Sequence, residues 1–155
     1  MLTYKIPGRP DIEVDNIAFD YNGTIAVNGK LIKGVDKLIN ILAQDVNIYI
    51  LTADTYGTAT GECENIKGEI LTFPRENAGQ SKKQIVEELK GNTICIGNGY
   101  NDIPMFEEAI LSIAILEEEG LAGQLLLRAD IVVRSIMEAL NILLNKDMIR
   151  ATLRN

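Results

Sequence analysis

The sequence predicts an α/β fold built on a doubly wound, mostly parallel sheet of the Rossmann-like kind, with helices on both faces. Short apolar runs alternate with amphipathic helical patterns, which is typical of strand–helix–strand units. The runs are apolar almost throughout, as expected for parallel strands that are covered on both sides. A length of 155 residues is usual for one domain, so we expect a single domain over residues 1–155.

The expected elements follow from these patterns in chain order. Strands are expected at residues 16–21, 46–52, 68–74, 92–98, 111–116 and 130–133. Helices are expected at residues 33–44, 55–66, 81–90, 102–110, 119–129, 135–144 and 146–155. Residues 1–16 are expected to add an edge hairpin that turns around Pro7-Gly8, and residues 17–155 to form the core.

Composition excludes several classes of function. The formal net charge is −7 without a stripe of lysine or arginine, so no nucleic-acid partner is expected. No apolar run approaches the roughly 18 to 20 residues that span a bilayer, and no leader-like segment opens the chain, so we expect a cytoplasmic protein without a membrane partner. The sequence contains no histidine, which excludes catalysis and metal binding by histidine.

Chemically active residues follow the expected strands where each strand ends. Asp20 stands where the apolar run of the first strand ends, Thr52-Ala53-Asp54 where the second ends, and residues 97–102 (Gly-Asn-Gly-Tyr-Asn-Asp) where the fourth ends. The lysine pair Lys82-Lys83 lies near the start of the preceding helix. In open α/β sheets ligands bind at the carboxyl ends of the strands. Carboxylates, a hydroxyl and a lysine gathered there indicate a site that handles a phosphoryl group with a divalent cation.

This pattern resembles the haloacid dehalogenase superfamily, and most closely the phosphorylation domain of P-type ATPases. "FDYNGT" is similar to the first motif of the family, "YILT" to the second, and "GNGYND" to the last, apart from Asn98 in place of an aspartate. Lys82 fits the lysine motif better than Lys83, because apolar residues follow it three, four and seven positions later. Only about 28 residues separate Thr24 from Thr52, so the resemblance implies a capless member without the nucleotide-binding insertion of the pumps.

The resemblance implies roles for residues of this chain. Asp20 would be the nucleophile that forms an aspartyl phosphate, and Asn22 stands at the position of the general acid and base. Mg²⁺ would be held by Asp20, the backbone carbonyl of Asn22, Asn98 and Asp102. The transferring phosphoryl group would be held by Gly23, Thr24, Thr52, Ala53 and Lys82.

Two substitutions weaken this chemistry. Asn22 cannot shuttle a proton at neutral pH, and Asn98 offers a metal an oxygen without a charge. The sequence therefore leaves two main interpretations open, with other Rossmann-like functions as a minor third. One is a slow Mg²⁺-dependent phosphatase or phosphotransferase, and the other is a non-catalytic domain that binds phosphate, metal or a protein. Because each asparagine precedes a glycine, deamidation that restores the missing carboxylates is a further hypothesis.

Simpler structural explanations exist for two of these segments. Asn22-Gly23 and Asn28-Gly29 are each strong hairpin signals, and a hairpin flap after the first strand is itself expected of the family. "GNGYND" lacks the third glycine of a dinucleotide fingerprint and comes late in the chain.

The expected partner is a small phosphorylated substrate or a phosphorylated macromolecule, with a homo-oligomer supplying the missing cap.

Overall fold

The computed structural model of the chain describes residues 1–54 and 57–155. The strands of the main sheet are β3 (Asn16–Asp20), β6 (Asn47–Thr52), β7 (Glu69–Thr72), β8 (Thr93–Gly97), β9 (Leu111–Ile115) and β10 (Ile131–Val133). Among the described residues they form a six-stranded, wholly parallel sheet in the order β10-β9-β8-β3-β6-β7. The predicted doubly wound parallel sheet is confirmed.

The chain reverses its direction of travel across the sheet beside β3. From β3 it moves outward through β6 to β7, and then returns to β8 on the other side of β3. Such a reversal leaves a crevice at the carboxyl ends of the central strands, and ligands of open α/β sheets bind in that crevice. The topology therefore predicts a ligand site at the carboxyl ends of β3, β6 and β8.

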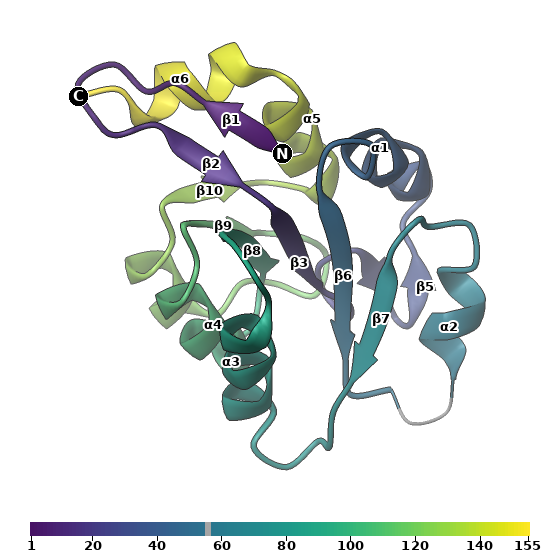
Figure 1. Cartoon of the computed structure of the whole chain (residues 1–155). Helices are drawn as coiled ribbons and strands as arrows, with labels where there is room; N and C mark the ends of the chain where they lie inside the picture. Colours follow the sequence, from purple (N-terminus) through teal and green to yellow (C-terminus); the bar gives the residue numbers. More distant parts are fainter. Residues whose placement is uncertain (55–56) are drawn as a thin grey trace.

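Helices cover both faces of the sheet. They are α1 (Val35–Leu42), α2 (Thr58–Glu62), α3 (Ala78–Glu88), α4 (Ile103–Glu107), α5 (Ile136–Leu144) and α6 (Lys146–Leu153), with the 3₁₀ helices η1 (Tyr100–Asp102) and η2 (Gly123–Leu127). Figure 1 shows α3 and α4 on one side of the sheet and α1, α5 and α6 on the other.

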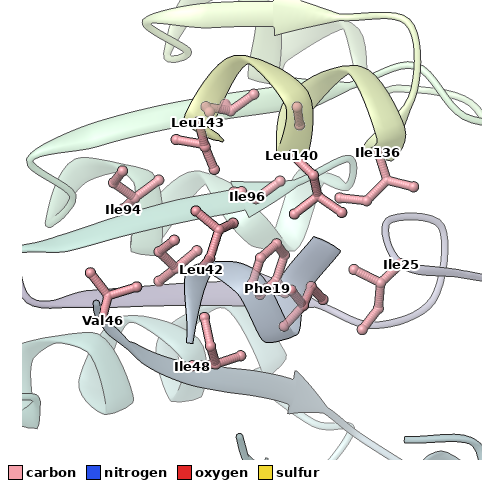
Figure 2. Packing of buried hydrophobic residues seen from close by; sticks show 14 of the residues in the cluster. Phe19, Ile25, Leu42, Val46, Ile48, Ile94, Ile96, Ile136, Leu140 and Leu143 are labelled. Atoms are coloured by element: carbon pink, nitrogen blue, oxygen red, sulfur yellow. The ribbon is translucent and has the colours of Figure 1, made fainter. Parts of the chain in front are cut away.

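Alternating residues of the central strands face two separate cores. Phe19 of β3 and Ile96 of β8 pack with Leu140 of α5 in the larger core, part of which Figure 2 shows. Ala18 and Cys95 point the other way, into the core under α3, α4 and η2. Because both faces are buried, β3, β8 and β9 are buried along their whole length, which explains their continuous apolar sequences.

Three expectations about elements need correction. The first hairpin forms, as β1 (Leu2–Tyr4) with β2 (Ile12–Val14), but it is a separate two-stranded sheet and not an edge of the main one. Its buried residues join the larger core, and the Tyr4 hydroxyl donates to the Leu143 carbonyl of α5 at 2.8 Å. The segment expected to be helical at residues 119–129 is the 3₁₀ helix η2.

The third correction concerns α2, which is shorter than the helix expected over residues 55–66. Residues 55–56 of that prediction lie outside the described residues. Within the described part of the chain, no helix is long and apolar enough to cross a membrane.

Candidate active site

The carboxyl ends of β3 and β6 bring Asp20 and Thr52 to the same edge of the sheet. The two strands pair in parallel with Asp20 opposite Leu51, so Thr52 lies one residue beyond Asp20 along the neighbouring strand. Both side chains belong to residues that are buried, with 8% of Asp20 and 3% of Thr52 exposed. The strand ends therefore meet where the sequence predicted.

Lys82 of α3 lies between two carboxylates. Its Nζ is 2.6 Å from Asp20 Oδ1 and 2.6 Å from Asp102 Oδ1, and it donates to Asn101 Oδ1 at 3.0 Å. Nζ also lies 5.9 Å from the centre of the Phe73 ring, within the range of a cation–π contact. Only 2% of Lys82 is exposed, so these partners replace the water that the ammonium group would otherwise bind.

Lys83 points away from this cluster. Its Nζ pairs with Glu108 at 3.0 Å and with Glu87 at 3.7 Å, and 28% of its side chain is exposed. Successive residues of a helix project about a hundred degrees apart, so only one lysine of the pair can face the sheet. The structure places Lys82, and not Lys83, beside Asp20.

Burial and charge shift the acidities within the cluster. Burial raises the pKa of Asp20, the carboxylate of Asp102 raises it further, and Lys82 and Thr24 oppose the rise, which leaves a pKa of about 7. Burial lowers the pKa of Lys82, but Asp20 and Asp102 outweigh that effect and hold it above its ordinary value. Lys82 is therefore a fixed positive charge beside a carboxyl group that loses its proton near neutral pH.

Thr24 brings the other oxygen of Asp20 together with Asn98. The Thr24 hydroxyl oxygen is 3.1 Å from Asp20 Oδ2 and 3.3 Å from Asn98 Oδ1. Gly23 makes this approach feasible: its φ is 83°, and a Cβ there would lie 2.8 Å from Asn98 Cγ. The first and last sequence motifs are therefore in direct contact.

Asp102 has both carboxylate oxygens engaged within the protein. Oδ1 accepts from Lys82, and Oδ2 accepts from the backbone N–H groups of Asn98 at 3.0 Å and Gly99 at 2.8 Å. No part of its surface is exposed. Asp102 thus holds the loop after β8 in place and neutralises the charge of Lys82. Its role as a direct metal ligand stays a prediction.

The segment after β6 is ordered by two further hydrogen bonds. The Asp54 backbone N–H donates to Thr52 Oγ1 at 3.1 Å, and Asp54 Oδ2 accepts from the Ala59 N–H at 2.7 Å. Ala53 lies half-buried between them. The predicted phosphate-binding segment therefore has a defined conformation at the strand end.

Asn22 lies outside the buried cluster. It is exposed, and it lines a cleft of about 560 Å³ together with Tyr21, Asn28, Ala53 and Asn101. The hairpin beside it is β4 (Ala26–Val27) with β5 (Lys30–Leu31), and its turn is Asn28-Gly29, where both residues have positive φ, as in a type I′ turn. The hairpin flap thus turns at Asn28-Gly29 and not at Asn22-Gly23.

The sequence reasoning gave no role to two residues of this site. Asn101 lies within the segment quoted for the last motif, so its contact with Lys82 had a signal in the sequence. Phe73 had none, because its relevance depends on the fold: it follows the edge strand β7, and its backbone N–H donates to the Thr52 carbonyl at 3.3 Å.

The oxygen atoms at the site suit a hard divalent cation, although they carry little charge. Asp20 Oδ2 and Asn98 Oδ1 converge on one hydroxyl, and carboxylate and amide oxygens are ligands that Mg²⁺ accepts. Among the described residues no cluster of three or more histidine, cysteine, aspartate or glutamate side chains could hold a metal. A cation here would rely on Asp20 for its protein charge, and on substrate oxygens and water for further ligands.

Known proteins are similar to this chain in sequence. An uncharacterized protein of Methanocaldococcus jannaschii is 40% identical over 93 residues, which cover 55% of this chain and 100% of that protein. A soluble P-type ATPase-like phosphatase of the same organism is 28% identical over 133 residues, 83% of this chain and 49% of that protein. The chain thus spans about half the length of that phosphatase.

Solved structures share the fold at low sequence identity. The cobalt-bound deoxy-D-mannose-octulosonate 8-phosphate phosphatase of Haemophilus influenzae matches with a TM-score of 0.68 and 13% identity over 92% of this chain and 94% of that one. The 3-deoxy-D-manno-octulosonate 8-phosphate phosphatase of Moraxella catarrhalis, in complex with magnesium, phosphate and KDO, matches with a TM-score of 0.67 and 15% identity over 91% of this chain and 94% of that one. The family model of haloacid dehalogenase-like hydrolases matches residues 3–109. The chain belongs to the haloacid dehalogenase-like hydrolases.

Proposed function

We propose that this chain is a metal-dependent phosphatase, or a phosphotransferase, in which Asp20 is the nucleophile. The observation that carries the proposal is the position of Asp20 at the switch point of the sheet. There its two oxygens contact Lys82 and Thr24, at 2.6 Å and 3.1 Å. The family membership and the phosphatase among the similar proteins support the same reaction class.

In the proposed first step a carboxylate oxygen of Asp20 attacks phosphorus, and the bond from phosphorus to the ester oxygen breaks. The product is an aspartyl phosphate and an alkoxide, which takes a proton from water because Asn22 has none to give. Lys82 offsets the charge on the phosphoryl oxygens and stays protonated throughout. Thr52 supplies a hydroxyl at the same edge of the sheet.

In the second step water attacks the phosphorus of the aspartyl phosphate. The acyl oxygen of Asp20 leaves, inorganic phosphate is released, and the attacking water loses its protons to solvent. A carboxylate at position 22 would assist this transfer, and positioned acid–base catalysis is worth about 10²- to 10⁴-fold. With Asn22 there we expect slow hydrolysis and a long-lived phosphoenzyme.

Mg²⁺ is the proposed cation, held by Asp20, Asn98 and the backbone carbonyl of Asn22. When bound it would neutralise charge on the phosphate and on Asp20. Replacement of an acidic ligand by Asn98 lowers the charge of the site, so we expect half-maximal activity only at high metal concentration. Two of the similar structures hold a divalent metal, cobalt in one and magnesium in the other.

The proposed substrate is a small phosphorylated molecule, because the solved phosphatases with this fold are named for a sugar-acid phosphate. A phosphorylated macromolecule remains the alternative for a site without a cap. The homo-oligomer that would cover the site stays a prediction.

One observation favours the non-catalytic alternative. Lys82 pairs with both buried carboxylates, and backbone N–H groups occupy the other oxygen of Asp102. Asp20 is then the one carboxylate of this cluster with a partly exposed side chain, at 11%. A domain that binds a phosphate or a protein without turnover would retain the same framework.

Release of inorganic phosphate from p-nitrophenyl phosphate separates these proposals. We expect turnover with Mg²⁺ or Co²⁺, its loss in excess EDTA, and its loss in Asp20→Asn. Asp11→Asn, at an exposed position before β2, is the matched control and should keep full activity. Turnover that persists in Asp20→Asn would contradict the catalytic proposal, and absence of turnover in the native protein with every metal would favour the binding domain.

A further inference from the structure

Arg75 is a positively charged side chain on the clefts beside the active site. One cleft, of about 560 Å³, is lined by Asn22, Ala53 and Arg75 among others, and the next, of about 760 Å³, by Asp54, Phe73 and Arg75 among others. Of the described residues that line the two clefts, Arg75 is the only lysine or arginine. It therefore lies where the part of a substrate beyond its phosphate would extend.

Among the described residues, the guanidinium group of Arg75 pairs with no carboxylate. Within the part of the chain that the structure describes, it makes no ion pair and no side-chain hydrogen bond, although the other arginines near acidic groups do. Asp54 and Glu76 line the cleft of about 760 Å³ together with Arg75, and Asp54 also lines the cleft of about 560 Å³. In a chain with a net charge of −7, an exposed arginine that forms no ion pair adds little to the stability of the fold.

The backbone around Arg75 is tied to the active site on both sides. Phe73 is buried against Lys82, and its N–H donates to the Thr52 carbonyl. Pro74 has a fixed φ, and Asn77, the residue directly before α3, has a φ of 57°. Since α3 carries Lys82 and the segment before Pro74 contacts Thr52, the position of Arg75 relative to the phosphate site is set by the fold.

We propose that Arg75 selects phosphomonoesters that carry a second anionic group, a carboxylate or a further phosphate. Arginine suits this role because its planar guanidinium group binds either anion through two parallel hydrogen bonds. The inference rests on the proposed function, since it takes the site at Asp20 as the place where the first phosphate binds. It adds a specificity residue outside the sequence motifs.

Equilibrium binding of non-hydrolysable phosphonates tests this directly, because it needs no turnover. A series of carboxyalkylphosphonates of increasing length is titrated calorimetrically at constant free Mg²⁺, each against the alkylphosphonate of equal length. A second series carries a terminal phosphonate instead of the carboxylate, so the two sources of negative charge are distinguished. Varying the length covers the span between the phosphate site and Arg75.

We expect one length at which the dianionic ligand binds about tenfold more tightly than its neutral-tailed partner, a usual size for a charge-assisted hydrogen bond. Arg75→Ala should abolish that preference, and Arg75→Lys should keep part of it, since lysine retains the charge without the planar fork. Arg128→Ala removes an exposed arginine that pairs with Glu107 outside the clefts and should change nothing.

Three outcomes would overturn the inference, and they are distinguishable. A preference that survives in Arg75→Ala, or no preference at any length, overturns the role of Arg75, while phosphatase activity that depends on Asp20 would leave the proposed function intact. If no phosphonate binds the native protein, the phosphate site itself is refuted and the inference with it.

Discussion

Asn22 and Asn98 are the two residues that set this site apart from an acidic phosphatase site. Asn22 lies two residues after Asp20 in the first motif and Asn98 lies in the last motif, and the structure gives them different surroundings. Asn22 is exposed at the cleft, whereas Asn98 contacts Thr24 and donates through Nδ2 to the Gly120 carbonyl at 2.9 Å. We therefore expect a substitution at Asn22 to affect the proposed chemistry alone, and a substitution at Asn98 to disturb the contacts of its side chain as well.

Asn22→Asp should accelerate the breakdown of the aspartyl phosphate by about 10²- to 10⁴-fold, because it restores a group that takes a proton from the attacking water. The rate is measured by following loss of the phosphoenzyme after the phosphate donor is removed. Asn65→Asp, at an exposed position outside the clefts beside Asp20, is the matched control and should leave the rate unchanged. An equal rate in Asn22→Asp and the native protein would show that position 22 takes no part.

Deamidation at Asn22 and Asn98 is disfavoured by the structure. The reaction needs the backbone nitrogen of the next residue to attack the asparagine side chain, but Gly23 N donates to the Ala26 carbonyl at 2.7 Å and Gly99 N to Asp102 Oδ2 at 2.8 Å. Asn28 lies in an exposed turn instead.

We therefore expect peptide mapping of aged protein to find conversion at Asn28 before Asn22 or Asn98. Mapping after unfolding in urea is the control, since all three Asn-Gly pairs should then react at similar rates. Faster conversion at Asn98 than at Asn28 in the folded protein would contradict the hydrogen bonds described above.

At the scale of single elements, helix α3 matters because it inserts one lysine between two buried carboxylates. Lys82→Met should lower the free energy of unfolding by about 3–5 kcal/mol, because it leaves buried charges without their partner. Lys83→Met removes exposed pairs only and should cost less than about 1 kcal/mol. Urea unfolding of both variants measures the difference, and equal losses would refute the placement of Lys82.

The parallel sheet and most element positions could be predicted from the sequence, since apolar runs and helical spacing repeat clearly, whereas the strand order could not. The residues Asp20, Thr52 and Lys82 were found because each follows or precedes such a run. The sequence predicts an ordinary helix where the structure has the 3₁₀ helix η2, because apolar spacing over a few residues does not distinguish the two. The sequence predicts that the hairpin β1–β2 lies at the sheet edge. A local pattern does not indicate which distant surface packs against the hairpin.

The loop between β7 and α3 shows a different limit. Phe73 and Arg75 lie in a segment without periodicity, and nothing local indicates that they border the active site. Their place depends on β7 lying beside β6, a pairing between residues far apart in the chain. Roles of this kind become visible only in the folded structure.

At the scale of the whole molecule, the two cores should protect both cysteines. Cys63 is 4% exposed and Cys95 is fully buried. Burial, with a smaller contribution from Glu62, raises the pKa of Cys63 to about 11, so about one thiol in a thousand is ionised at pH 8. Burial also raises the pKa of Cys95.

Iodoacetamide at pH 8 should therefore modify neither cysteine in the folded protein and both in denaturant, as intact mass spectrometry would show. Because reaction requires the thiolate to form in water, the rate reports how often each core opens. Fast modification of Cys95 under native conditions would contradict the tight packing between the sheet, α3 and α4.

The proposed reaction depends most on Asp20 as the nucleophile. Trapping the phosphorylated enzyme tests this role most directly. The native protein and Asp20→Asn are incubated with acetyl phosphate and Mg²⁺, quenched in acid, and compared by intact mass. We predict a single phosphoryl adduct on the native chain and none on the variant, with the adduct persisting because Asn22 cannot assist its hydrolysis. An adduct on both proteins, or on neither across several donors and divalent metals, would contradict the proposed role of Asp20.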